Sequence, residues 1–333
     1  MKFLQKMSKD MKDRLITFGI LFGAFLIVEI LILTGGASRH LQAMLIPICI
    51  NMLLAVSLNL TVGFLGELTL GHAGFMSVGA YAGCLFSIYC KDLLPVFIRY
   101  PLAMLIGGAV AAVFGILIGI PVLRLKGDYL AIVTLAFGEI IRSVIINLDF
   151  LGGAAGLKGT PQDATFISSF AVVVISVLLI LNFLNSKSGR AIKSIRDNRI
   201  ASESCGVQIT YYKMLAFVFS AFFAGIAGVI YGHNLNILTA DTFDYNKSIE
   251  ILLIVVLGGM GSIRGSVIAA VIITALPEAL RGLDKYRMVI YAVLLIAIMI
   301  FNSSEFGKRI REKYDPKKLF AKKNAVKKEN ADE

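Results

Sequence analysis

The sequence predicts an all-α fold, a polytopic membrane bundle of about ten transmembrane helices (eight to ten) with both termini in the cytoplasm. Of its 333 residues, 57% are hydrophobic and only 17% are charged, whereas a soluble domain is about a quarter charged. Apolar runs of about 20 residues, long enough to cross a hydrocarbon core, recur along the chain. The alternating segments of about ten residues that are typical of membrane β-barrels do not occur. Helices are therefore expected to carry the whole fold.

Ten apolar spans correspond to the predicted helices. The eighth and tenth are short, which sets the lower count of eight. Pro101 stands near the start of the fourth span, where a proline suits a helix N-terminus. In chain order, the spans are 15–33, 43–64, 72–90, 101–123, 129–148, 165–184, 214–233, 248–258, 266–280 and 288–301.

The distribution of basic residues predicts the orientation. If the N-terminus is cytoplasmic, 24 of the 33 Lys and Arg residues fall in inside connections or the termini, and only eight fall outside. Cytoplasmic connections carry this excess in membrane proteins. The net charge of +11, which would indicate nucleic-acid binding in a soluble protein, is thus explained by topology, and we expect no nucleic-acid partner.

Three parts follow from this topology. Residues 1–14 are a basic cytoplasmic segment, residues 15–301 the transmembrane domain, and residues 302–333 a basic cytoplasmic tail that is expected to be solvated and to contact anionic lipid. The longest polar connection, 185–213, contains Ile192, Ile195 and Ile200 at helical spacing. We expect short amphipathic helices there, interrupted at Gly206. Such a loop either docks a cytoplasmic partner or only anchors the topology.

Two charged residues stand inside the fifth span. Glu139 and Arg142 are three residues apart, so they share a helix face and can pair. Each charge alone would cost about 2.5–3.5 kcal/mol at a helix centre. The pair either lines a polar pathway or fixes helix packing.

Glycines gather between the eighth and ninth spans, in "VLGGMGSIRG". Gly258, Gly259 and Gly261, with Gly265, permit a sharp turn or close backbone approach. A nucleotide-binding role is excluded because no strand–helix context surrounds them. We expect a re-entrant or broken-helix joint.

A second polar interruption, "GELTLGHAGF" at 66–75, separates the second and third spans. Gly66, Gly71 and Gly74 permit unwinding or tight helix contact. Glu67 and His72 are titratable, and such groups inside membranes often mark ion paths. The alternative is a polar turn that caps two helices. The residues alone leave both interpretations open.

No constellation in the sequence supports catalysis. It has neither the P-loop pattern nor H-E-x-x-H, and it lacks a nucleophile with a histidine partner. Its four cysteines have no metal-ligand spacing. We therefore predict a chain that is not an enzyme, with no cofactor and no metal site.

Six stretches occur in the order found in one known family. They are "GFLGELTLGHAGFMSVGAY", "FGEIIRSVIIN", "LGGAAGLKGTP", "SGRAIKSIRDNRIASESCGVQ", "AFVFSAFFAGIAGVIYG" and "VLGGMGSIRG". The chain closely resembles, over residues 40–300, the permease subunit of bacterial branched-chain amino-acid ABC importers, the larger of the two permease types.

The resemblance implies a multi-pass permease subunit in the bacterial plasma (inner) membrane. Its implied partners are a second permease subunit that completes a heterodimer, two cytoplasmic ATPase subunits, and a periplasmic or lipid-anchored amino-acid-binding protein. The family's coupling loop, which docks on the ATPase, maps onto 185–213. Five residues match its pattern, namely Gly189, Arg190, Arg196, Glu203 and Gly206.

Two departures and two alternatives accompany the resemblance. Glu67 stands where many members carry Gln, which argues against an obligatory proton carrier there. The resemblance thus favours a glycine-permitted joint at 66–75 that shapes or gates the cytoplasmic half of the path. Ser266 occupies a position often held by Pro. A permease for urea or simple sugars is the nearest alternative within ABC importers. A stand-alone ion-coupled secondary transporter is an alternative of another class, based on Glu67, His72 and the Glu139–Arg142 pair.

Overall fold

The computed structural model describes residues 39–125, 127–280 and the single positions 289, 290, 292, 293, 296 and 300. The predicted segment 1–14, the span 15–33, most of the span 288–301 and the tail 302–333 lie outside these residues. The chain divides into two units after Ala275. Every contact given below joins residues of the first unit.

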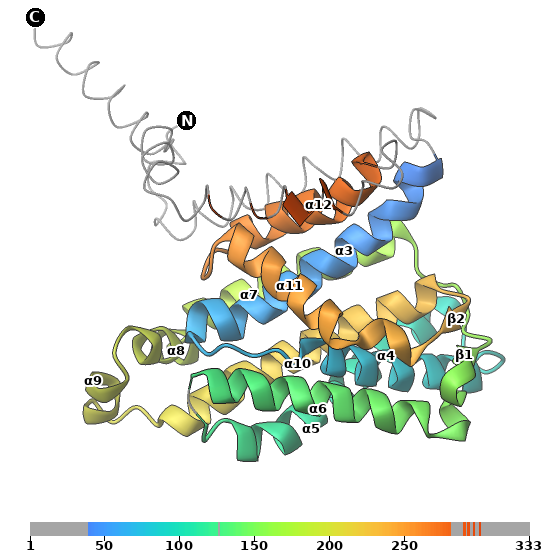
Figure 1. Cartoon of the computed structure of the whole chain (residues 1–333). Coiled ribbons are helices and arrows are strands. Elements are labelled where there is room, and N and C mark those ends of the chain that lie inside the picture. The colour runs from blue at the N-terminus through green and yellow to red at the C-terminus, as the bar shows by residue number, and fades with distance from the viewer. Residues whose placement is uncertain are drawn as a thin grey trace, which may run out of the picture. The chain divides into compact units, whose positions relative to one another are not determined.

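The described chain is almost wholly helical (Figure 1). The described helices and strands follow one another along the chain from α3 to α12. The long helices are α3 (Arg39–Asn59) with the π-helix η1 (Leu60–Leu65), α4 (His72–Tyr89), α5 (Val96–Val122), α6 (Asp128–Ile146), α7 (Phe166–Asn185), α10 (Ile209–Asn234), α11 (Tyr245–Gly258) and α12 (Ile263–Ala279). Eight predicted spans, from 43–64 to 266–280, therefore correspond to observed helices.

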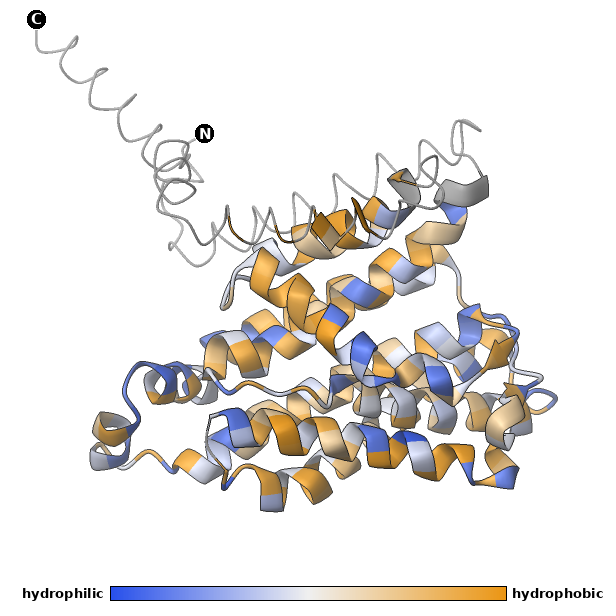
Figure 2. Cartoon of the chain, viewed as in Figure 1, coloured by the Kyte–Doolittle hydropathy of each residue, from blue (hydrophilic) through white to orange (hydrophobic). Residues whose placement is uncertain are grey.

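Five helices among the described residues are long and apolar enough to cross a membrane: α3 with η1, α5, α6, α7 and α10. Hydrophilic residues concentrate at two opposite places, around α8 (Lys187–Asp197) with α9 (Arg199–Ser204), and around the strands β1 (Leu157–Lys158) and β2 (Ile237–Leu238) (Figure 2). We call these the α8 end and the β1–β2 end of the bundle. The predicted all-α membrane architecture is confirmed for the residues that the structure describes.

The β1–β2 end is closed by short elements. The two strands pair antiparallel, with Leu157 opposite Leu238. The short helices η2 (Asp149–Leu151), η3 (Gly153–Ala155) and η4 (Ala240–Phe243) flank them. These elements belong to the connections that follow α6 and α10.

The core is the contact of α10 with α4 and α5. Small residues let these helices approach closely, as is common where membrane helices pack. A Cβ added to Gly225 of α10 would lie 2.5 Å from the Ala111 Cβ and 2.8 Å from the Gly107 carbonyl oxygen of α5. One added to Gly79 of α4 would lie 2.5 Å from the Gly225 carbonyl oxygen.

Two predicted helix starts are five residues too late, and one of them is that of α10, which begins at Ile209 rather than at 214. Helix α5 begins at Val96 rather than near Pro101, which lies within the helix. The N-cap is Pro95, whose φ of −63° and ψ of 152° place it in extended conformation immediately before the helix. Because a proline ring already fixes φ near this value, it suits the position before the helix.

The predicted amphipathic connection is confirmed for Ile192 and Ile195 but not for Ile200 of α9, which is 78% exposed. Within 185–213, α8 buries Ile192 and Ile195 on one face, and α9 ends just before Gly206, whose φ is +81°. The two helices turn at Asn198, whose side chain accepts a hydrogen bond from the backbone N–H of Ala201 at 3.0 Å. Asn198 thus caps α9 and fixes the angle between the helices.

Candidate functional site at the α8 end of the bundle

The segment after η1 turns back into the bundle. Gly66 takes the left-handed conformation with φ of +80°, which ends the helix, and residues 67–71 are not helical. The next helix, α4, begins at His72, whose Nε2 lies 2.8 Å from the Ser57 Oγ of α3. Because Ser57 is eight residues before the end of η1, α4 begins about 12 Å inside that end. The predicted joint is confirmed as a break between helices, and it is re-entrant (Figure 1).

Contacts with α6 hold this re-entrant segment, residues 66–71. The Leu70 backbone N–H donates to the Thr134 Oγ1 at 3.0 Å. A Cβ added to Gly71 would lie 2.7 Å from the Thr134 carbonyl oxygen, and one added to Gly74 would lie 2.9 Å from the Gly138 Cα. Gly71 and Gly74 are thus required by the close approach of α4 to the α6 backbone.

Arg196 of α8 reaches the same segment. Its Nη1 donates to the Gly63 carbonyl oxygen in η1 at 2.6 Å. Its aliphatic carbons border Gly66, where an added Cβ would lie 3.2 Å from the Arg196 Cγ. An added Cβ at Gly261 would likewise lie 2.8 Å from the Arg196 Nη1. One side chain therefore touches the re-entrant segment, the π-helix and the turn between α11 and α12.

A buried ion pair joins the segment to α10. The Lys213 Nζ donates to the Glu67 Oε1, and the two side chains are 3% and 17% exposed. Lys213 lies in the first turns of α10, where the α8–α9 connection enters the bundle. The pair neutralises both charges where neither is well solvated.

The predicted glycine cluster forms a tight turn between α11 and α12, as expected. Gly259 and Gly261 have φ of +91° and +81°, and a Cβ added to Gly258 would lie 2.5 Å from the Ser266 backbone nitrogen. Asn59, at the end of α3, holds this turn. Its Oδ1 accepts from the Gly261 N–H at 2.8 Å, and its Nδ2 donates to the Ser262 carbonyl at 3.2 Å and the Ser266 Oγ at 2.7 Å.

Replacing Asn59 with alanine is expected to loosen this turn. Asn59 is fully buried, so its removal leaves the Gly261 N–H without this acceptor, at about 1–3 kcal/mol, whereas the Ser262 carbonyl still accepts from the Ser266 backbone N–H at 3.0 Å. Denaturation of the purified protein in mixed micelles measures the loss. The control is Asn198→Ala, which removes an exposed cap and should cost about 1 kcal/mol. Equal losses in the two variants would contradict the role of Asn59.

The five residues of the predicted coupling pattern separate into three kinds. Gly189 is structural, because an added Cβ would collide with the Leu184 backbone. Gly206 ends α9 with positive φ. Arg190 and Glu203 are exposed on the outside of α8 and α9. Arg196 is exposed as well, but its guanidinium reaches back to the bundle and donates to the Gly63 carbonyl oxygen.

The Glu139–Arg142 pair lies elsewhere, in the half of α6 nearer the β1–β2 end. The predicted pairing is confirmed, with the Arg142 Nε 3.0 Å from the Glu139 Oε2. Arg142 also pairs with Asp241 of η4, Nη1 to Oδ1 at 2.9 Å. The structure thus does not bring this pair to the α8 end with the other predicted residues.

Sequence reasoning missed Asn59, Lys213 and Asp241. Asn59 is one of two asparagines in the apolar span 43–64, with Asn51, which is a usable signal, since an unpaired amide is costly in a membrane. Lys213 enters the sequence argument only as one of the basic residues that predict the membrane orientation. Within the described residues, no group of three His, Cys, Asp or Glu side chains could hold a metal ion.

Comparison with known proteins matches this helical membrane chain to transport permeases. The family model described as the branched-chain amino acid transport system permease component matches residues 40–301. The chain is 35% identical to the high-affinity branched-chain amino acid transport system permease protein LivM of Salmonella typhimurium and 33% identical to that of Escherichia coli, each over 59% of this chain and 54% of the relative.

A third relative is archaeal. The chain is 26% identical to the probable branched-chain amino acid transport permease protein LivM of Methanocaldococcus jannaschii, over 61% of this chain and 66% of the relative. The chain spans about half the length of the first two relatives. No solved structure matches it.

Proposed function

This chain belongs to the family of branched-chain amino acid transport permease components, and we propose that it is the membrane subunit of an ATP-driven importer of branched-chain amino acids. The chain is a multi-pass membrane protein. Its proposed role is translocation alone, with ATP hydrolysed on separate subunits. The observation that carries the proposal is the meeting of α8, the re-entrant segment and the α11–α12 turn at Arg196.

The proposed arrangement has about ten transmembrane helices in residues 15–301, with both termini and the α8 end in the cytoplasm. Residues 302–333 form a cytoplasmic tail beside the lipid. The excess of basic residues on that side supports this topology. A second permease subunit would complete the path, and one of two ATPase subunits would dock on 185–213. A binding protein would deliver the amino acid at the β1–β2 end.

In this proposal, one set of residues contacts the ATPase and another residue transmits the movement of α8 to the bundle. The exposed Arg190 and Glu203 face the ATPase, while Gly189 and Gly206 fix the helix ends that present them. Arg196 transmits the movement of α8 inward, because its guanidinium holds the Gly63 carbonyl at 2.6 Å. Displacing α8 would therefore pull on η1, the re-entrant segment and the α11–α12 turn together, opening or closing the α8 end of the path.

Two substitutions are expected to separate the two roles. Glu203→Lys should reduce the amount of ATPase subunit that co-purifies with the permease. Arg196→Ala should leave co-purification intact but reduce amino-acid uptake per ATP hydrolysed at least tenfold in proteoliposomes. The matched control is Arg199→Ala, an exposed arginine of α9, which should leave the uptake-to-ATP ratio within twofold of the natural protein. Full coupling in Arg196→Ala would contradict the transmission role.

The class of transporter is tested separately. Proteoliposomes with this chain alone, given a proton gradient, should show no uptake of leucine, whereas the assembled complex with ATP and binding protein should. Gradient-driven uptake by the chain alone would favour a secondary transporter. Ligand binding to the associated binding protein distinguishes branched-chain amino acids from urea or sugars.

A further inference from the structure

Charged side chains gather on one face of α6, η4 and α11. Arg142 is held between Glu139 and Asp241, and the Lys247 Nζ lies 3.0 Å from the Glu250 Oε2. These side chains are between 21% and 75% exposed. We call the set of five residues the charged face.

The charged face extends from Glu139, near the middle of the bundle, to Asp241 of η4, toward the β1–β2 end. Glu139 follows Gly138, which touches Gly74 in the first turn of α4. Lys247 precedes Ser248, whose Oγ accepts from the Ala73 N–H at 3.1 Å. The start of α4 is itself about 12 Å inside the end of η1. Toward lipid, each such charge would cost about 2.5–3.5 kcal/mol. This face therefore meets water or protein.

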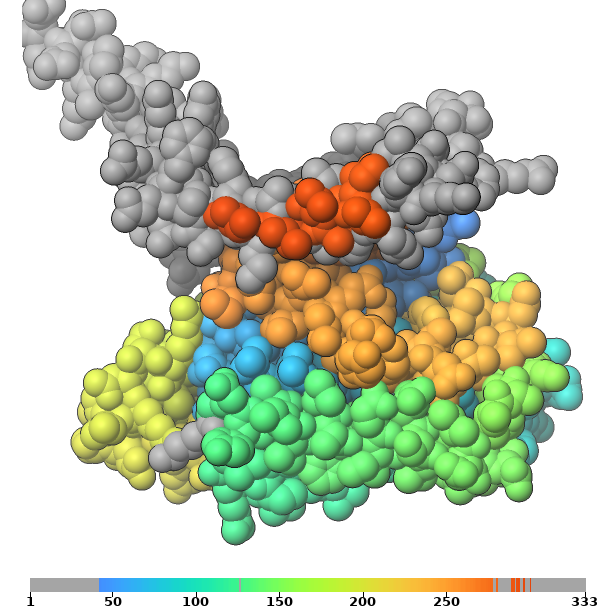
Figure 3. Space-filling view, viewed as in Figure 1, coloured from blue at the N-terminus to red at the C-terminus, as the bar shows by residue number. Residues whose placement is uncertain are grey.

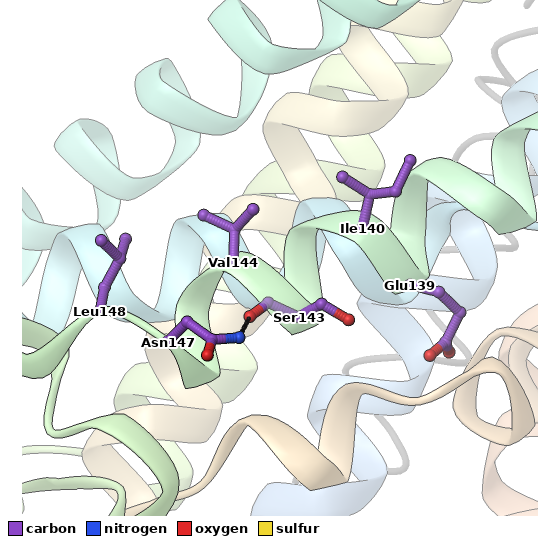
Figure 4. Close-up of a pocket in the computed structure, with 6 residues that line it drawn as sticks. All are labelled: Glu139, Ile140, Ser143, Val144, Asn147 and Leu148. Carbon is purple, nitrogen blue, oxygen red and sulfur yellow. Dashed lines mark hydrogen bonds between the residues drawn. The ribbon is translucent and has the colours of Figure 1, made fainter.

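A shallow, open and mostly apolar depression, which we call the α6 groove, lies on the surface of α6 beside Glu139. Its volume is 460 Å³, and the residues that line it come from α6 and its C-terminal end: Glu139, Ile140, Ser143, Val144, Asn147 and Leu148. Figure 4 shows the polar members pointing to one side and the apolar members to the other. Because a single helix supplies the lining, the opposite wall must come from outside these residues.

The two sides of the groove fit an amino acid with an aliphatic side chain. The zwitterion carries an ammonium and a carboxylate at one carbon, and its side chain is apolar. The charged face holds three carboxylates against two cations, so one negative charge is left over for the ammonium. The hydroxyl of Ser143 and the amide of Asn147 can donate to the carboxylate. Ile140, Val144 and Leu148 can contact the side chain.

We propose that the α6 groove, with Arg142 and Asp241, is one wall of the water-filled path and holds the charged groups of the passing amino acid. This rests on the proposed function. The second wall would come from the other permease subunit. Figure 3 shows α6 and α11 on either side of a strip in which residues near the re-entrant segment are visible. The link to the segment that α8 contacts is Gly138, directly before Glu139, where an added Cβ would lie 3.8 Å from the Gly71 Cα.

The test is labelling of single cysteines in the assembled complex in proteoliposomes. Ser143→Cys, made with Cys90 and Cys205 replaced by serine, is treated with a water-soluble, charged methanethiosulfonate. The matched control is Ile175→Cys, an exposed position midway along α7. We expect Ser143→Cys to react at least tenfold faster than the control, and leucine with binding protein to slow the reaction at least threefold.

Each outcome decides the proposal. Labelling of Ser143→Cys without protection by leucine would overturn substrate contact, and equal rates at the two positions would overturn the aqueous wall. ATP-driven leucine uptake is measured in parallel on vesicles with only Cys90 and Cys205 replaced by serine and Ser143 intact. Absence of uptake there would count against the proposed function, while the difference between the two labelling rates would still report whether water reaches the groove.

Discussion

Replacing Glu67 with alanine is expected to destabilise the protein by about 3–5 kcal/mol, because it leaves the Lys213 ammonium buried without a partner. Lys213 is the more buried member, at 3% exposure against 17% for Glu67. The reciprocal variant, Lys213→Met, should therefore cost less, since the remaining carboxylate retains some access to water. Denaturation in mixed micelles measures both losses, and leucine uptake should fall with them.

Two controls make this expectation specific. Asp197→Ala removes an exposed carboxylate of α8 and should change stability by no more than about 0.5 kcal/mol. The double variant Glu67→Gln with Lys213→Met removes both charges and should recover most of the loss, because a neutral pair of similar volume is often as stable as a buried ion pair. If Glu67→Ala were as mild as Asp197→Ala, the pair would not hold the re-entrant segment to α10.

The second large effect is expected at Gly71. In Gly71→Val, the Cβ alone would lie 2.7 Å from the Thr134 carbonyl oxygen, and this oxygen belongs to the α6 backbone, which cannot rotate away. The re-entrant segment or α6 must shift, at about 1–3 kcal/mol or more. We expect leucine uptake by the assembled complex to fall more than tenfold.

His72→Ala is the matched comparison, one residue away. It removes the contact of the His72 Nε2 with the Ser57 Oγ, but Ser57 keeps its hydrogen bond to the Leu54 carbonyl at 2.9 Å. No backbone collision arises, so uptake should fall less than in Gly71→Val. Uptake measured at equal amounts of folded complex gives the ranking, and the reverse order would mean that the histidine, rather than the helix approach, matters here.

Much of the fold is readable from periodicity and composition. The span 72–90 predicts α4 to within a residue, because polar and glycine-rich segments bound an apolar run on both sides. Gly259 and Gly261 predict a sharp turn because left-handed backbone favours glycine. Ile192 and Ile195 predict an amphipathic α8. Each of these features is encoded by residues close together in the sequence.

Local sequence patterns could not predict how deeply residues 66–71 enter the bundle. The segment 66–71 has the same composition whether it forms a surface turn or re-enters the bundle. Its position follows from contacts with Thr134 and Ser57, on two other helices. A local pattern does not contain the level at which a segment meets its neighbours.

The sequence by itself determined that this protein is a bundle of membrane helices with glycine breaks, since hydrophobicity and backbone freedom act over a few neighbouring residues. Tertiary structure alone decided that Arg196 faces the Gly63 carbonyl and that Lys213 pairs with Glu67, 146 positions away. A buried charge requires a partner, but the sequence around it does not identify that partner. In a membrane protein, helix packing determines which residue lies near enough to pair with the charge.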